Sequence, residues 1–179
     1  ALGIIRDGEL VYQCGYGMAD IEKSEAIDPL KSRFYVASVS KQFTAACIIM
    51  VAAHGKLSLE DDVRIYFPEL PDYGHEISLR HLTHHTGGLR DYLDLWWFAG
   101  RSFTGPLSNE DGMGLLLRQR QLDFEPGSKF VYCNSGYKLF AELVPRITGL
   151  TLRQFAEREL FAPRGMRDTF FDDDNAAIE

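Results

Sequence analysis

The sequence is short of basic residues, cysteines and long uncharged stretches. Its 179 residues include 19 lysines and arginines against 26 aspartates and glutamates, which gives a formal net charge of −7. Nucleic acids and anionic membrane surfaces attract positive charge, so an acidic chain is a poor match for either, and we expect no nucleic-acid partner. No apolar run approaches the roughly 20 residues that a membrane-spanning helix needs, so we expect no membrane span.

The three cysteines exclude a disulfide framework. Cys14, Cys47 and Cys133 are odd in number and far apart, and no Cys-x-x-Cys pair occurs. We therefore expect free thiols, as in a core or beside a site. No signal peptide is visible, and the sequence leaves the compartment open between cytoplasmic and periplasmic or secreted.

The histidines are too poorly spaced for a metal site. His81, His84 and His85, with His75 nearby, could suggest a metal, but on a helix only His81 with His84 or His85 would share a face. No aspartate or glutamate completes an open site there, so we expect no metal and no cofactor. We expect a loop or turn role before Gly87-Gly88. The rival interpretation, a metal hydrolase built on these histidines, would be revealed by sensitivity to a chelator.

One segment pairs a nucleophile with a basic group. Residues 42–53 contain no charge, and their apolar side chains cover almost the whole circumference of a helix, so we expect this helix to be buried all round. Ser38 and Lys41 are three residues apart and would share a face at its start. A hydroxyl and an amine in contact form a nucleophile and its proton acceptor, and desolvation would favour the neutral amine of Lys41. The positive end of the helix dipole would face Ser38.

Ser-x-x-Lys alone is a weak signal, because it occurs a second time at Ser135 and Lys138. The helical pattern after Asn134 places Lys138 with Glu142 and Arg146, opposite the apolar positions. We therefore expect Lys138 to lie on a solvated face, held charged by Glu142. This leaves Ser38 as the predicted nucleophile.

The chain changes character after residue 37. Two short β-rich runs, 2–6 and 10–15, flank Asp7-Gly8, which is a strong hairpin signal. We divide the chain into N-terminal strands at 1–37, a helical domain with the candidate motifs at 38–165, and the start of a return to the sheet at 166–179. A further strand is predicted at 34–36, and later helices at 78–84, 89–98, from 108, 134–147 and 151–161, with Pro145 expected to kink or shorten the fourth.

Three segments in order carry a resemblance to a known family. Ser38-x-x-Lys41 is followed by residues 82–89 (LTHHTGGL) and by residues 125–137 (EPGSKFVYCNSGY), which contain Tyr132-x-Asn134. With the opening hairpin, this pattern resembles the serine β-lactamase and penicillin-binding-protein superfamily. Tyr-x-Asn in place of Ser-Asp-Asn resembles its class C-like branch, which includes DD-peptidases and β-lactamase-fold esterases.

The resemblance covers nearly the whole chain and implies an α+β fold of the β-lactamase/transpeptidase type. The chain would form mainly the helical domain, plus an N-terminal hairpin of an antiparallel sheet. It also implies an acyl-enzyme mechanism on small esters, amides or β-lactams. Ser38 would attack a carbonyl, and Lys41 and Tyr132 would share proton transfer. Asn134 would orient Lys41 and bind substrate, and the backbone N–H of Ser38 would form half of an oxyanion hole.

The family's third motif, Lys-Thr-Gly or His-x-Gly on a strand beside the nucleophile, has no match in this sequence, and we expect the chain to stop before it. The sheet would then lack its later strands. We expect self-association, or a second chain, to complete the sheet. The alternative function is a catalytically incomplete fragment or pseudo-enzyme that acts as a binding or partner chain.

Overall fold

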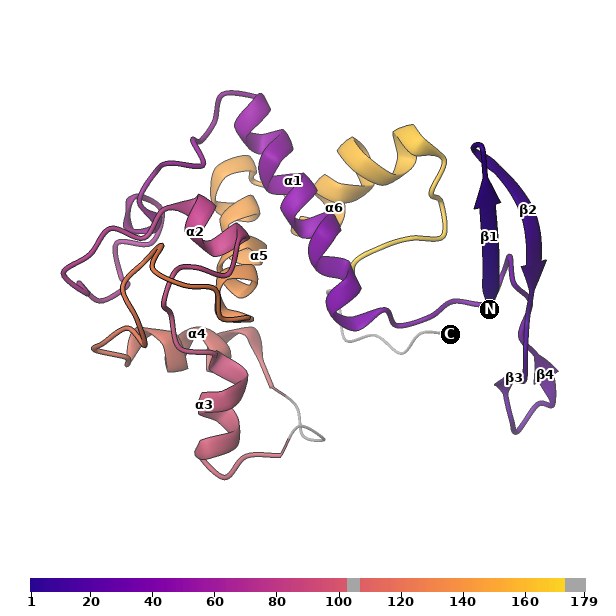
Figure 1. The fold of residues 1–179 in the computed structure, drawn as a ribbon, viewed down its shortest axis with the longest axis horizontal. Helices are drawn as coiled ribbons and strands as arrows, with labels where there is room; N and C mark the ends of the chain where they lie inside the picture. The colour runs from indigo at the N-terminus through magenta and orange to yellow at the C-terminus, as the bar shows by residue number, and fades with distance from the viewer. Residues whose placement is uncertain (103–106, 173–179) are drawn as a thin grey trace. The chain divides into compact units, whose positions relative to one another are not determined.

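The computed structural model describes residues 1–102 and 107–172 (Figure 1). The chain divides into two compact units, Ala1–Ala37 and Ser38–Glu179. The first contains strands and the second contains helices, as expected of an α+β fold. The last seven residues of the predicted return to the sheet lie outside the described part.

The first unit is built from two hairpins. Strands β1 (Leu2–Arg6) and β2 (Glu9–Cys14) pair antiparallel. The turn residues Asp7 and Gly8 both have positive φ, 52° and 83°, as a two-residue turn of type I′ requires. The predicted hairpin is therefore confirmed. A second hairpin, β3 (Met18–Asp20) with β4 (Glu25–Ala26), was not predicted.

The predicted strand at 34–36 is wrong. These residues carry no strand pairing, and Phe34 and Tyr35 are exposed. Their β-rich composition favours extended backbone, but a strand also needs a neighbour for its N–H and C=O groups, and no described segment pairs with them.

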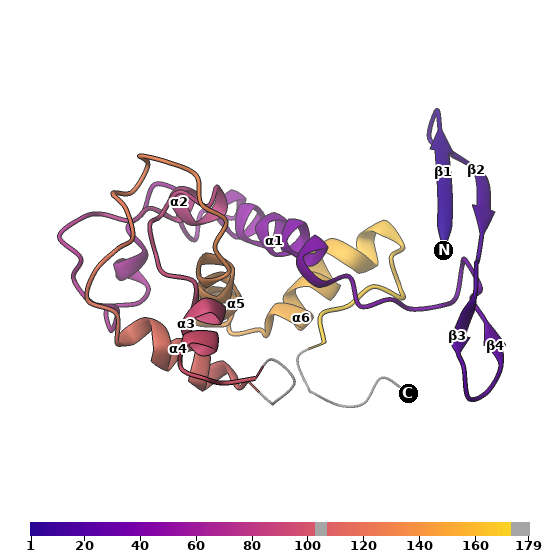
Figure 2. The same ribbon diagram turned by 60° about the horizontal axis from the view of Figure 1, so that its bottom comes forward.

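In the second unit, α1 (Lys41–Ala53) follows a short 3-10 turn, η1 (Ala37–Ser40), and packs against α5 (Ser135–Thr148) and α6 (Leu152–Ala156) (Figures 1 and 2). One side of α1 is buried. The expectation that it is buried all round is wrong in the described residues, because Ile49 remains 52% exposed. Apolar composition makes burial favourable, but it does not supply the partner that covers the second side.

The remaining helices begin at side-chain caps. Ser78 and Ser108 cap α2 (Leu79–Thr83) and α4 (Asn109–Leu117) as predicted, each with its oxygen accepting from a backbone N–H of the first turn. Helix α3 (Tyr92–Phe98) begins three residues later than predicted, because Asp91 is its cap.

The end of the helical unit follows the predicted order. Pro145 does not shorten α5, which continues to Thr148 and ends at Gly149 in the left-handed conformation (φ 73°). Thr151 caps α6, which continues as a π-helix (η3, Glu157–Phe161) and a 3-10 turn (η4, Ala162–Arg164). A further 3-10 turn (η2, Val63–Ile65) precedes α2. The core is made of large apolar side chains of α1, α5, α6 and the connecting segments, including Ile48, Phe67, Leu139, Phe140, Phe155 and Phe161.

Candidate active site

The first catalytic pair predicted from sequence is in contact. Ser38 lies in η1, one turn before Lys41 opens α1, and the Lys41 ammonium donates a 3.0 Å hydrogen bond to Ser38 Oγ. The preceding residue, Ala37, has φ 45°, in the left-handed region that a residue with a Cβ rarely adopts. Ser38 itself is exposed to solvent and directly follows this strained residue.

Tyr132 approaches the same oxygen from the loop before α5. Its hydroxyl donates a 2.7 Å hydrogen bond to Ser38 Oγ, and the Lys41 nitrogen lies 5.0 Å from the centre of its ring. Burial raises the pKa of Tyr132, but its interactions with Lys41 and Ser38 outweigh that effect and hold the pKa below the ordinary 10.0.

Asn134 is the fourth predicted residue, and it also reaches the cluster. Asparagine at the start of a helix usually caps it with its own side chain, but Asn134 makes no such cap on α5. Its Oδ1 instead accepts a 2.8 Å hydrogen bond from Lys41 Nζ. All four predicted residues therefore lie in one hydrogen-bonded group. Whether Asn134 also binds substrate stays a prediction.

The loop that carries Tyr132 is tied to the segment 85–88 by backbone hydrogen bonds. Val131 N–H donates to the His85 carbonyl at 3.0 Å, and Gly127 N–H donates to the Thr86 carbonyl at 2.8 Å. At Gly88, φ is 73° and a Cβ would lie 2.1 Å from a carbonyl oxygen of the facing loop, so only glycine fits there. The motif at 82–89 thus helps to position Tyr132.

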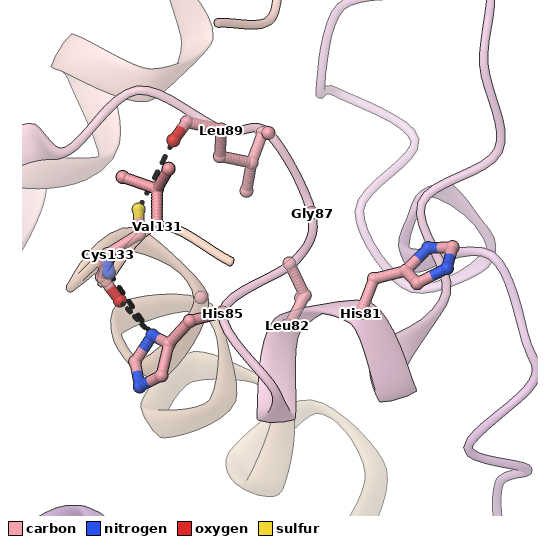
Figure 3. Close-up of a pocket in the computed structure, with 9 residues that line it drawn as sticks. His81, Leu82, His85, Gly87, Leu89, Val131 and Cys133 are labelled. Carbon is pink, nitrogen blue, oxygen red and sulfur yellow. Dashed lines mark hydrogen bonds between the residues drawn. The ribbon is translucent and has the colours of Figure 1, made fainter. Parts of the chain in front are cut away.

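His85 is a residue whose position the sequence did not reveal. We expected a loop or turn role for it, and its φ of 57° fits a turn. Its ring, however, packs against Tyr132 at 4.6 Å and against Tyr137 at 5.2 Å between centroids. Its Nδ1 lies 3.0 Å from the carbonyl oxygen and 3.1 Å from the backbone nitrogen of Cys133 (Figure 3). Burial is the main reason that the pKa of His85 lies below 6.5.

The cavity behind this loop is too small for a substrate. It is bordered by His85, Cys133 and the glycines of the 82–89 motif, and its volume is about 10 Å³ (Figure 3). That is room for about one water molecule. The Cys133 thiol donates to the Leu89 carbonyl at 3.2 Å, so it adds a hydrogen bond between the loop of Tyr132 and the 82–89 motif.

The second Ser-x-x-Lys pair differs from our expectation. Lys138 is not on a solvated face, because it is only 9% exposed and donates to Asn109 Oδ1 and Glu142 Oε1. Burial lowers the pKa of Lys138 below 10.5, while Glu142 opposes that shift. The helical pattern failed here because α4, which supplies Asn109, packs over this side of α5.

Ser135 is nevertheless a poor nucleophile. It is fully buried, donates to the Arg90 carbonyl at 2.6 Å and accepts from Tyr92 N–H at 2.9 Å. Its hydroxyl therefore holds the start of α3 against α5. Lys138 makes its two side-chain bonds elsewhere, so this pair does not reproduce the contact between Ser38 and Lys41.

The remaining predicted features have plain local roles. The three cysteines are free thiols, as expected. His81 completes the cap of α2, and His84 Nδ1 lies 2.9 Å from the Arg80 carbonyl. Within residues 1–102 and 107–172, no three histidine, cysteine or acidic side chains gather as a metal site would require. No helix in the same part of the chain is long and apolar enough to cross a membrane.

Comparison with known proteins shows the family and the fold of this chain. The family model described as Beta-lactamase matches residues 1–179. The chain belongs to the β-lactamase family. It is 34% identical over 165 residues to penicillin-binding protein 4* of Bacillus subtilis, a match that covers 90% of this chain and 35% of that protein. It is 33% identical over 179 residues to a D-aminopeptidase of Brucella anthropi, covering 99% of this chain and 34% of the relative.

Among solved structures, the octameric penicillin-binding protein homologue from Pyrococcus abyssi superposes with a TM-score of 0.81 at 26% identity. The match covers 92% of this chain and 38% of that one. The β-lactamase-family chain thus has the fold expected from its motifs. It spans about a third of the length of the curated relatives that it matches.

Proposed function

We propose that this β-lactamase-family chain carries the nucleophilic machinery of a serine hydrolase that cleaves amide bonds through an acyl-enzyme at Ser38. The observation that supports this most directly is the pair of hydrogen bonds that meet at one oxygen. Ser38 Oγ accepts from Lys41 at 3.0 Å and from Tyr132 at 2.7 Å. Two potential proton carriers on an exposed serine are the arrangement that nucleophilic catalysis needs.

The protonation state of this group decides which residue acts as the base. With Lys41 and Tyr132 both donating, the lone pairs of Ser38 Oγ are occupied and its own proton has no acceptor among them. Attack therefore requires one of the two to lose its proton first. The lowered pKa of Tyr132 favours the phenolate, with the Lys41 ammonium beside it as the stabilising charge.

Acylation would then proceed through a tetrahedral intermediate. Ser38 Oγ bonds to the carbonyl carbon while its proton moves to Tyr132, and the carbonyl oxygen becomes an anion. The backbone N–H of Ser38, at the start of the helical segment, would donate to that anion. When this tetrahedral intermediate collapses, the C–N bond breaks and Tyr132 returns the proton to the leaving amine. Water then attacks the acyl-Ser38 ester and gives its proton to Tyr132. The ester bond breaks, and Tyr132 returns the proton to Ser38 Oγ.

Amides are proposed as the substrate class because one relative is named for D-aminopeptidase activity. Esters would react by the same route with a better leaving group. β-Lactams, which are cyclic amides, are proposed as slower or inhibitory acylating agents. The alternative, a pseudo-enzyme that binds a partner chain without turnover, would leave Ser38 unacylated by all three classes.

Covalent labelling tests the proposal. The protein is treated with a fluorophosphonate and separately with a labelled penicillin, and the modified peptide is identified by mass spectrometry. We expect label on Ser38, loss of label in Ser38→Ala, and full labelling in the matched variant Ser40→Ala. Label on Ser135 alone, or equal label on Ser38 and Ser135, would overturn the assignment.

A further inference from the structure

Asp91 is hydrogen-bonded to Asn134, one of the four residues of the candidate site. Its Oδ2 accepts two hydrogen bonds from Asn134, one from the backbone N–H and one from side-chain Nδ2 at 2.8 Å. Its Oδ1 accepts from Leu93 N–H at 2.8 Å and so caps α3. One carboxylate thus joins the start of α3 to the first residue before α5.

This contact fixes which way the amide of Asn134 points. An amide can rotate by 180° and exchange its oxygen with its nitrogen, so its orientation depends on its partners. An ionised carboxylate only accepts hydrogen bonds, which obliges Nδ2 to face Asp91. Oδ1 then faces Lys41, whose ammonium only donates, and the 2.8 Å bond to Lys41 Nζ can form.

We infer that Asp91 is a positioning residue for the proposed acylation, acting through Asn134 to hold Lys41 against Ser38. The inference rests on the proposed function, because it assigns a role in that reaction. The four side chains form a continuous line: Asp91 accepts from Asn134, Asn134 accepts from Lys41, and Lys41 donates to Ser38 Oγ. Without the carboxylate, the orientation of Asn134 would no longer be determined by its environment.

A competing role for Asp91 can be separated from this one. Asp91 also lines a cavity of about 230 Å³, together with Arg90, Asp94, Leu95, Phe98 and Asp123. If Asp91 served to bind substrate in that cavity, its loss would raise KM and leave kcat nearly unchanged. A positioning role predicts the opposite, a fall in kcat with little change in KM.

The decisive variant is Asp91→Asn. Asparagine is as good a helix cap as aspartate, but its single oxygen can accept either from Leu93 N–H, which keeps the cap of α3, or from Asn134, and not from both. With the cap kept, the NH2 group of the new amide faces Asn134 as a second donor, unless the Asn134 amide turns over and presents Nδ2 to Lys41. We expect kcat on an amide or ester substrate, and the rate of Ser38 labelling, to fall roughly 10- to 100-fold. Losses of this size are typical when a residue that orients a functional side chain through a hydrogen bond is removed, as for residues that orient metal ligands.

Two further variants make the result unambiguous. Asp91→Ser keeps a capping hydroxyl but cannot reach Asn134, and we expect the same loss of kcat. Thr151→Ala removes the cap of α6 instead and should lower the melting temperature without lowering kcat. Unchanged kcat in a folded Asp91→Asn protein whose wild type is labelled at Ser38, or a change confined to KM, would overturn the inference. Absence of label on wild-type Ser38 would overturn the proposed function itself.

Discussion

Tyr132 donates a 2.7 Å hydrogen bond to Ser38 Oγ across 94 residues of sequence. The contact is set by elements on both sides. Ser38 is held at the start of α1, and Tyr132 is held in a loop that is bonded to the segment 85–88 and packed on His85. The distance between these two oxygens therefore depends on residues that need not touch the substrate.

The first prediction concerns Lys41. Lys41→Ala should abolish acylation of Ser38, because it removes the charge that stabilises the Tyr132 phenolate and a donor to Ser38. The melting temperature should change little, since Lys41 is only partly buried and is not among the core residues of α1. Rapid-quench labelling and a thermal melt measure the two quantities.

The buried lysine Lys138 provides the contrast. Lys138→Ala leaves Glu142 and Asn109 without their partner, so it should lower stability while the labelling rate of the folded fraction stays near wild type. Full labelling in Lys41→Ala would contradict the role given to Lys41.

The second prediction is a pH dependence that resides in Tyr132. Because the pKa of this phenol lies below 10.0 and the base is its ionised form, the acylation rate should rise with pH and level off before pH 10. Tyr132→Phe should lower the rate ~10²- to 10⁴-fold and remove that rising limb. Stopped-flow acylation between pH 5 and 10 is the measurement. An unchanged rising limb in Tyr132→Phe would assign the titration to another group.

The third prediction separates His85 from its neighbour. His85→Asn accepts the left-handed backbone and can still reach Cys133, but it removes the ring that packs on Tyr132. We expect slower acylation, whereas His84→Asn should behave as wild type. Equal effects of the two substitutions would show that the ring contact is irrelevant.

His85 also predicts a dependence of stability on pH. Its pKa is lower in the folded state than the ordinary 6.5, so the unfolded chain binds the proton more readily. The stability contributed by neutral His85 is therefore present above pH 6.5 and is lost as pH falls through the folded pKa. Urea unfolding at pH 7.5 and 5 should show a smaller loss of stability in His85→Asn than in wild type.

A chelator distinguishes the serine mechanism from the metal rival. Because none of the groups assigned to the proposed reaction requires a metal ion, EDTA should leave the labelling rate unchanged. Loss of activity with EDTA that zinc restores would move the assignment to the histidines of residues 75–85.

The sequence predicted which side chains meet at the candidate site better than it predicted their surroundings. The spacing of Ser38 and Lys41 was informative because a single helical turn fixes it. The burial of Lys138 was not, because a helical pattern shows which residues share a face but does not show that α4 covers that face. The positions of Asp91 and His85 were missed for a related reason. Each makes hydrogen bonds with a residue about 45 positions away, and no local period in the sequence encodes such contacts.

The last prediction concerns association through the first hairpin. Strands β1 and β2 pair only with each other among the described residues, and their apolar side chains are exposed, Ile5 by 72%. An exposed apolar strand edge is a template for pairing with another chain, and a second copy is the partner we propose. Sedimentation velocity should show an associated species whose share of the protein increases with concentration.

Ile5→Lys should reduce the share of this associated species, because a lysine on an edge strand opposes pairing. Ile65→Lys, at a residue 64% exposed in the helical unit, is the matched control and should leave association unchanged. A monomer at all concentrations, or equal effects of the two lysines, would exclude the hairpin as the associating surface.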